Sequence, residues 1–227
     1  MHNALDTTQL SAKYETEMNA NYKIPASLST VMSEREFDPE TYGWHWSVLP
    51  SDILIENGRG TYFNIQRSSG FCARNTIAVF IDGACPGNGQ PWARGSWGVY
   101  FGSDSWLNDC DLLDNDEPQT SQRAELTAAI RALALIKALN GQHRNMRHFV
   151  IVSDSEYVVN GISDYIERWK YNGWKNSAGR NVANQDLWEE LDYLCWHHEK
   201  NIGTVVFWRV DRDENEAADA LARSALE

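Results

Sequence analysis

Thr76–Gly89, TIAVFIDGACPGNG, joins an apolar run to a turn, and it indicates the fold class of this chain. The run Ile77–Ile81 ends on one acid, Asp82, and a segment rich in Gly, Pro and Asn follows. This pattern predicts a buried strand that carries a carboxylate to its C-terminal end, where open sheets place their chemistry. Taken alone, the stretch also fits an ordinary strand end, because Asp-Gly is a common turn pair.

Length and charge limit what the chain can be. Its 227 residues suffice for one domain of about 150 residues and an extension. The net charge of −12 argues against a broadly basic nucleic-acid-binding surface and favours a site that collects metal cations. A nucleic-acid partner would therefore have to be attracted locally, with the help of metal.

The cysteines and the N-terminus bear on location. The four cysteines match no zinc pattern and no disulfide framework, which favours reduced thiols. The chain contains no run of about 18 apolar residues, so we expect no membrane span. Its first residues, MHNALDTTQL, do not resemble a secretory signal, and a mitochondrial presequence is not expected either. We therefore expect an intracellular protein, in the cytoplasm or the nucleus.

Two parts are expected along the chain. Residues 1–75 form an extension, disordered or loosely attached up to about Ser33, with short strands or a clasp from Phe37 to Arg74 that packs on the rest. Residues 76–227 form the main domain, an α/β fold with a mixed five-stranded sheet flanked by helices. Its strands are expected at Ile77–Ile81, Ser96–Gly102, Ser105–Leu113, His148–Ser153 and Gly203–Val210, and its main helices at Ser121–Asn140, Asn184–His198 and Glu214–Leu226.

Four acids stand out against this background. Asp82 and Asp154 each follow an apolar strand, Glu125 lies in the first turns of a helix, and Asp219 lies in the first half of the last helix. Each acid alone fits a surface charge or a helix cap. If the two strands are neighbours, however, the carboxylates converge, and close acids repel one another unless a cation joins them. Mg²⁺ prefers such oxygen ligands, and two ions can serve a phosphoryl displacement.

Five motifs in this order resemble the type 1 ribonuclease H family over about residues 76–226. They are Asp82-Gly83-Ala84-Cys85-Pro86-Gly87-Asn88, Thr120-Ser121-Gln122-Arg123-Ala124-Glu125-Leu126, Ser153-Asp154-Ser155-Glu156-Tyr157-Val158, Gly173-Trp174-Lys175-Asn176-Ser177-Ala178-Gly179 and Asn215-Glu216-Ala217-Ala218-Asp219-Ala220-Leu221-Ala222. The resemblance implies a ribonuclease H-like fold and endonucleolytic hydrolysis of the RNA strand of RNA–DNA hybrids. By the same resemblance, this hydrolysis would leave 3′-hydroxyl and 5′-phosphate ends.

The resemblance also implies roles for single residues. Asp82 would bridge two Mg²⁺ ions, for which Mn²⁺ can substitute. Glu125 would hold one ion and help to read the RNA 2′-hydroxyl, and Asp154 and Asp219 would complete the two ion sites. The polar positions along the RNA minor groove fall on Asn88 and Gln122, and the pocket for a DNA-strand phosphate falls on Thr120 and Asn184. The segment along the DNA strand has Trp169, Lys170, Trp174 and Lys175, although core packing is an equal alternative for the two tryptophans.

Three departures from the family pattern indicate weakened function. The segment Trp208–Asn215 lacks the histidine that the family often carries before the last helix, although Asp211, Asp213 or Glu214 could substitute for it. Histidines 143, 148, 197 and 198 lie elsewhere and are expected at the surface. Glu156 would oppose an approaching phosphate, and Glu117 and Pro118 stand where a relative can place an arginine.

The sequence therefore leaves three functions open. The first is a Mg²⁺-dependent, monomeric ribonuclease H, with an unidentified protein partner for the extension. The second is a weakly active or inactive nucleic-acid-binding protein on the same fold, which the missing histidine and the acidic surface favour. The third is a related nuclease, or a transposon-derived domain, that acts on another nucleic acid; Asn88, Thr120 and Gln122 favour the hybrid over this one.

Overall fold

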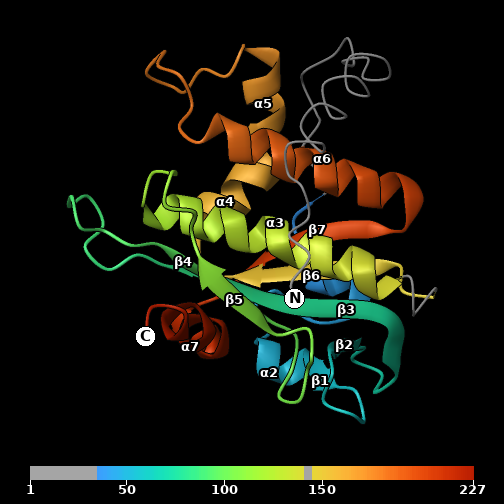
Figure 1. The fold of residues 1–227 in the computed structure, drawn as a ribbon. Helices are drawn as coiled ribbons and strands as arrows, with labels where there is room; N and C mark the ends of the chain where they lie inside the picture. Colours follow the sequence, from blue (N-terminus) through green and yellow to red (C-terminus); the bar gives the residue numbers. More distant parts are fainter. Residues whose placement is uncertain (1–34, 141–144) are drawn as a thin grey trace.

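A computed structural model describes residues 35–140 and 145–227. The whole of the predicted loosely attached segment, to Ser33, lies outside these residues. The strands in chain order are β1 Leu54–Glu56, β2 Phe63–Gln66, β3 Cys72–Ala84, β4 Ser96–Tyr100, β5 Asp109–Leu112, β6 His148–Ser153 and β7 Thr204–Arg209. The helices are α2 Pro50–Ile53, α3 Ser121–Asn140, α4 Glu156–Asn160, α5 Ile166–Tyr171, α6 Gln185–Asn201 and α7 Glu216–Ser224. The α/β class is confirmed (Figure 1). The five strands expected in the main domain are present as β3 to β7, and β1 and β2 bring the mixed sheet to seven strands.

The long strand β3 is the centre of the sheet. Its first half pairs antiparallel with β2, and its second half pairs antiparallel with β4, from Phe80 to Ala84. On its other side it runs parallel to β6, which in turn runs parallel to β7. The two additional strands come from the extension: β1 pairs with β2, and β2 finds a partner because β3 begins at Cys72, before the predicted start at Ile77.

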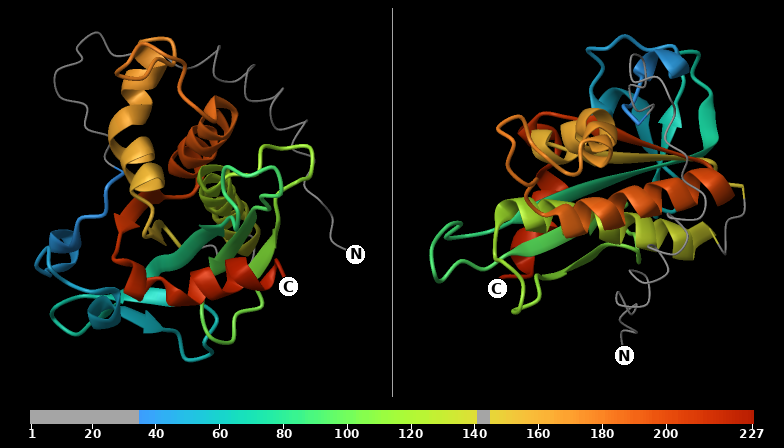
Figure 2. Two further views of the ribbon diagram at one scale, coloured as in Figure 1. Left: turned by 90° about the vertical axis from the view of Figure 1, so that its left-hand side faces the viewer. Right: turned by 90° about the horizontal axis from the view of Figure 1, so that it is seen from above.

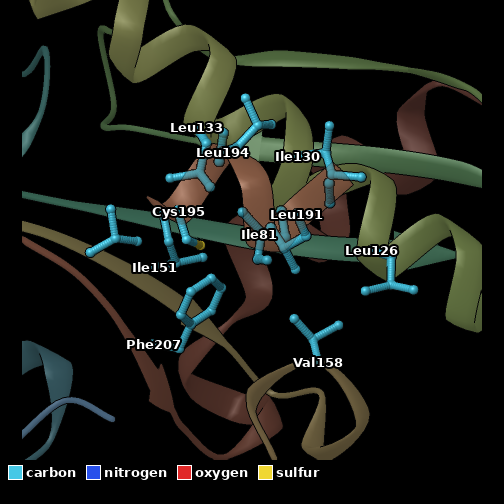
Figure 3. Close-up of a cluster of buried hydrophobic side chains, with 14 of the residues drawn as sticks. Ile81, Leu126, Ile130, Leu133, Ile151, Val158, Leu191, Leu194, Cys195 and Phe207 are labelled. Atoms are coloured by element: carbon cyan, nitrogen blue, oxygen red, sulfur yellow. The ribbon is translucent and has the colours of Figure 1, made fainter. Parts of the chain in front are cut away.

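The first face of the sheet is covered by α3, α4 and α6 (Figures 1 and 2). Odd-numbered residues of β3, such as Ile77, Val79 and Ile81, point into this layer, as the two-residue period of a strand requires. Figure 3 shows how Leu126 and Leu133 of α3 and Leu191 of α6 gather over Ile81, as part of one buried cluster. Helix α3 begins and ends at the predicted residues, since its apolar positions recur at helical spacing.

The second face is shared between α7 and the extension. Ala78 and Phe80 of β3 point to this side, where Ala218 of α7 packs together with Phe37 and Ile65 from the extension. The expected short strands that pack on the main domain are therefore present, as β1 and β2. The division of the chain at residue 75 stays a prediction, because β2 and β3 share one sheet across that point.

Residues 35–37 also extend the sheet at its β7 edge. Glu36 forms a parallel bridge with Phe207, in which Phe37 N donates to Phe207 O at 2.9 Å and Phe207 N donates to Arg35 O at 2.6 Å. The Phe37 ring packs on Trp208, with the ring centroids 4.7 Å apart. The described part of the extension therefore runs from the edge strand β7 along the second face.

Some predictions differ from the structure in detail. Between two of the predicted helices, α4 continues through a π-helical turn, Gly161–Tyr165, into α5, and neither α4 nor α5 was among the main helices expected. His198 is fully buried, so its expected place at the surface was wrong, while His143 lies outside the described residues. Within the described parts of the chain, each helix is too short or too polar to cross a bilayer.

Candidate active site and nucleic-acid interface

The four acids are delivered to one end of the sheet by four different elements. Asp82 lies near the C-terminal end of β3, and Asp154 follows the last residue of β6. Because β3 and β6 are parallel neighbours, these two side chains reach the same edge. Glu125 comes from the second turn of α3 and Asp219 from the first turn of α7. We call Asp82, Glu125, Asp154 and Asp219 the carboxylate cluster.

Two glycines let the helices come close enough to place their acids. A Cβ atom at Gly83 would lie 2.3 Å from the backbone nitrogen of Glu125, so only glycine lets α3 press against β3 at this point. A Cβ atom at Gly98 in β4 would lie 2.7 Å from the carbonyl oxygen of Ala218, which is the residue before Asp219. These close contacts fix how near α3 and α7 lie to the sheet, and therefore where Glu125 and Asp219 stand relative to Asp82.

Neighbouring groups hold each acid of the cluster. Asp82 accepts a hydrogen bond from the backbone N–H of Gly83 at 2.7 Å. Ser155 Oγ donates to Glu125 at 2.6 Å, and Asn215 Nδ2 donates to Asp154 at 2.8 Å. Asp219 accepts from Arg223 Nε at 2.7 Å and from Arg212 at 3.4 Å, in an ion-paired arrangement that is partly exposed.

Asp82 has the most unfavourable environment of the four. Its residue is only 8% exposed, and burial, together with the charges of Asp154, Asp219 and Glu125, raises its pKa from 3.8 to about 7. The hydrogen bond from Gly83 offsets part of this rise. Burial also raises the pKa of Glu125, and the charge of Asp154 raises it further. The cluster therefore holds more negative charge than its surroundings neutralise.

The donor set of the cluster fits a divalent cation that prefers oxygen ligands. Three further acids surround Asp82, and their charges add to the rise in its pKa. A bound cation would lower the pKa of Asp82 again. In the conformation shown, no three His, Cys, Asp or Glu side chains of the described residues are grouped tightly enough to hold an ion. Asp219 is instead engaged by two arginines, which an ion would have to replace as its partners.

The predicted contacts for the RNA strand lie beside the start of α3. Asn88 is exposed, and its side chain exchanges hydrogen bonds with Ser121, with Nδ2 to Ser121 Oγ at 3.3 Å and Ser121 N to Oδ1 at 3.4 Å. Gln122 is the next residue and is exposed as well. The fold thus brings Asn88 and Gln122 together, one turn of α3 away from Glu125.

Thr120 precedes α3 and Asn184 precedes α6, and Arg123 joins the starts of these two helices at one corner. Thr120 Oγ1 accepts from the backbone N–H of Arg123, and the guanidinium of Arg123 donates to Asp186, two residues after Asn184. Asn184 has a left-handed φ of 57° and donates to the hydroxyl of Tyr157 at 3.1 Å. Arg123 is almost buried and pairs with both Glu117 and Asp186, so this corner carries no excess of positive charge.

The aromatic segment is partly core. Trp169 of α5 packs on the buried Trp188 with ring centroids 5.2 Å apart, and Trp174 lies 6.2 Å from Trp169 by the same measure. Both rings remain half-buried, and Lys175 beside them is exposed. Lys170 differs from Lys175, because its side chain is only 12% exposed and pairs with Glu167 and Asp192. Figures 1 and 2 place α5 and α7 at opposite ends of the molecule.

Three supporting residues received no role from the sequence. Ser155 holds Glu125 and also caps α4, since its Oγ accepts from Val158 N at 3.2 Å. Asn215 ties Asp154 to the Ile81 carbonyl oxygen, to which it donates at 3.0 Å. Arg223 engages Asp219. Ser155 and Asn215 lie within the quoted motifs, but their partners are distant in sequence, so the motifs gave no sign of these bonds.

Comparison with known proteins assigns the family. The sequence model of the family described as RNase H matches residues 74–227. The chain belongs to the RNase H family. A ribonuclease H of Halorhodospira halophila is 38% identical over 159 residues, which cover 68% of this chain and 95% of the relative. A ribonuclease HI of Neisseria meningitidis is 40% identical over 147 residues, covering 65% and 92%.

Among solved structures, LC9-RNase H1, described as a type 1 RNase H with the type 2 active-site motif, is 27% identical. The match has a TM-score of 0.49 and covers 66% of this chain and 71% of that one.

Within the RNase H family, the three departures of this chain now have a structural setting. Glu156, the acid expected to oppose phosphate, forms an ion pair with Arg209, and both side chains are exposed. Glu117, at the position where a relative can have an arginine, pairs with Arg123. The segment without the histidine forms a short 3₁₀ turn, Arg212–Glu214, and sends Arg212 toward Asp219.

Proposed function

We propose that this RNase H hydrolyses the RNA strand of RNA–DNA hybrids at the carboxylate cluster. The observation that carries the proposal is the state of Asp82, which is buried among three further acids with its pKa raised to about 7. A fold keeps such mutually repelling groups at a stability cost, and a site that binds cations and phosphate esters gives them a use.

The cation that we propose is Mg²⁺, bound as two ions, with Mn²⁺ as a substitute. Asp82 would contact both ions, Glu125 would hold one of them, and Asp154 and Asp219 would complete the two sites. When bound, such ions activate a water molecule and stabilise the leaving oxygen of a phosphodiester. The chain's own contribution is to keep Glu125 and Asp154 oriented through Ser155 and Asn215.

The remaining candidate residues would hold the hybrid along one line. Asn88 bonds to Ser121 at the start of α3, and Gln122 lies one turn before Glu125, so both could donate to 2′-hydroxyl groups and so distinguish RNA from DNA. Thr120 and Asn184 would receive a DNA phosphate, and Trp169, Trp174 and Lys175 would follow the DNA strand. A substrate that contacts both α7 and α5 spans the length of the domain (Figure 1).

The decisive experiment is cleavage of an end-labelled RNA–DNA hybrid with Mg²⁺, with and without a chelator. Asp82→Asn should abolish cutting. Asp104→Asn, the same change at an exposed aspartate in the loop after β4, should leave it unaltered. Absence of metal-dependent cutting at high enzyme concentration would refute the proposal. Equal cutting of duplex RNA or duplex DNA would refute the specificity for hybrids.

A second candidate function is hybrid binding with little catalysis. Its support is that Asp219 is held by Arg212 and Arg223, and that Arg123 is neutralised by Glu117 and Asp186. Native gel electrophoresis of the same labelled hybrid, run beside the cleavage assay, distinguishes the two functions. This candidate predicts that the chain slows the hybrid on the gel but produces no cleaved RNA.

The proposal extends to a monomeric, intracellular protein of the cytoplasm or nucleus. All four cysteines are free thiols, and Cys195 is buried, which suits a reducing compartment. Light scattering of the purified chain and localisation of a tagged full-length copy would test the two statements. A stable dimer or a secreted product would contradict them.

A further inference from the structure

A partly buried network of ion pairs joins the extension to the helices of the first face. Arg35, which is 9% exposed, donates to Asp192 Oδ1 of α6 at 2.7 Å. Its Nε and Nη2 atoms donate to the two carboxylate oxygens of Glu199 at 2.8 and 3.1 Å. This two-point contact fixes the plane of the guanidinium, as arginine–carboxylate pairs do. The arginine is fixed at its other end by the backbone bridge between residues 35–37 and β7.

Asp192 links Arg35 to helix α5. The residue is 2% exposed, and while one carboxylate oxygen accepts from Arg35, the other accepts from Lys170 Nζ at 2.9 Å. Lys170 belongs to α5 and also pairs with Glu167 one turn earlier, at 2.8 Å. We call Arg35, Glu167, Lys170, Asp192 and Glu199 the Arg35 network. It alternates in charge, so each cation contacts two acids.

Helix α5 carries part of the proposed DNA-strand contact. Trp169 precedes Lys170, and the backbone N–H of Trp174 donates to the carbonyl of Trp169 at 2.7 Å, so the loop with Trp174 and Lys175 follows the orientation of α5. The π-helical turn Gly161–Tyr165 separates α5 from α4. The direction of α5 is therefore not set by one regular helix, and the bond from Lys170 to Asp192 supplies a fixed point.

We propose that Arg35 is a positioning residue for nucleic-acid binding, which acts through Asp192 and Lys170 to hold α5 and the loop with Trp174 and Lys175 against the DNA strand. This inference rests on the proposed function. Arg35 lies outside residues 74–227, the part matched by the family. The extension would thus give this chain its own support for the surface that carries Trp169, Trp174 and Lys175.

The test combines two measurements on the full chain. Hydrogen exchange of the amides of 166–176 reports on the fixation of α5 without any substrate, and steady-state cleavage of a hybrid with Mg²⁺ separates KM from kcat. Arg35→Met should speed exchange in 166–176 about five- to tenfold and raise KM about fivefold, with kcat within about twofold. Lys170→Met should act alike, and the double variant should add little to either.

Two further variants keep the test sharp. Arg74→Met removes a positive charge from an exposed arginine of β3 and should change neither reading. If Arg35→Met does not fold, Arg35→Lys, which keeps the charge but loses the two-point contact with Glu199, should show the same effects in smaller size.

Unaltered exchange in 166–176 would overturn the positioning role, whatever the activity. Faster exchange with unchanged KM would overturn the link to substrate. A wild-type chain that does not cleave hybrids would overturn the proposed function and the substrate half of this inference, while the exchange data would still decide the fixation of α5.

Discussion

Two clusters of charged groups lie inside this molecule, and they are built in opposite ways. The carboxylate cluster contains only acids, and its central member, Asp82, has its pKa raised to about 7. In the Arg35 network, Asp192, which is also buried, accepts hydrogen bonds from two cations. Buried like charges destabilise a fold, whereas paired ones hold it together when none is left without a partner. The first cluster therefore needs an ion from outside, and the second is completed by the chain itself.

The largest effect should come from breaking the first cluster. Asp82→Asn should reduce hybrid cleavage at least about 10³-fold, because the group proposed to contact both ions loses its charge. The same variant should be more stable than the wild type without metal, since the repulsion is gone. Single-turnover cleavage and thermal unfolding in a chelator measure the two effects. A variant that lost both activity and stability would mean that Asp82 is structural.

The carboxylate cluster should also make the stability of the metal-free protein depend on pH. Because the folded pKa of Asp82 lies above its ordinary value of 3.8, the unfolded chain releases this proton first as the pH rises. The metal-free protein should therefore lose stability between about pH 4 and pH 7, by at most about 4 kcal/mol from this group. Urea unfolding across this range, with Asp82→Asn as the reference, isolates the contribution. Parallel pH profiles for the two proteins would contradict it.

The same substitution should have the opposite sign in the Arg35 network. Asp192→Asn leaves Arg35 and Lys170 sharing a neutral amide, and we expect a loss of about 3 kcal/mol in the free energy of unfolding. Equilibrium unfolding in urea measures the loss. The exposed Asp104→Asn serves as the control and should stay within about 0.5 kcal/mol of the wild type. Equal and small effects at both positions would remove the contrast between the clusters.

The smallest effect should be the response to Mg²⁺. Added Mg²⁺ should raise the unfolding free energy of the wild type by about 1–2 kcal/mol at pH 8, and by less at pH 5, where protons compete for the cluster. Asp82→Asn should respond less at both values. Calorimetric unfolding with and without Mg²⁺ gives the comparison. An equal response of the variant would place the ion elsewhere.

Local patterns predicted the part of the fold that depends on near neighbours. The apolar run Ile77–Ile81 and the helical spacing in Ser121–Asn140 gave β3 and α3, and the four acids at strand and helix ends gave the carboxylate cluster. These features are visible because strands and amphipathic helices repeat every few residues. The helix α5 was missed, since a π-helical turn before it interrupts that period.

Contacts between distant residues could not be predicted in this way. Arg35 and Asp192 are 157 positions apart, and an arginine among polar residues carries no local sign of a buried partner. The pairing of β2 with β3 was missed for a similar reason, because it depends on how far β3 extends before Ile77. The roles of Ser155 and Asn215 became visible only with the acids in place.

The bridge between residues 35–37 and β7 also has a consequence for handling the protein. β7 is an outer strand, and Glu36 covers part of its free edge, while Phe37 and Ile65 cover apolar side chains of the second face. A chain trimmed to residues 74–227, the part that the family shares, would expose an unpaired strand and the apolar surface beside it. Such edges recruit further strands from other molecules. Trimming at the family boundary should therefore yield aggregates, so the extension belongs in any recombinant form of this RNase H.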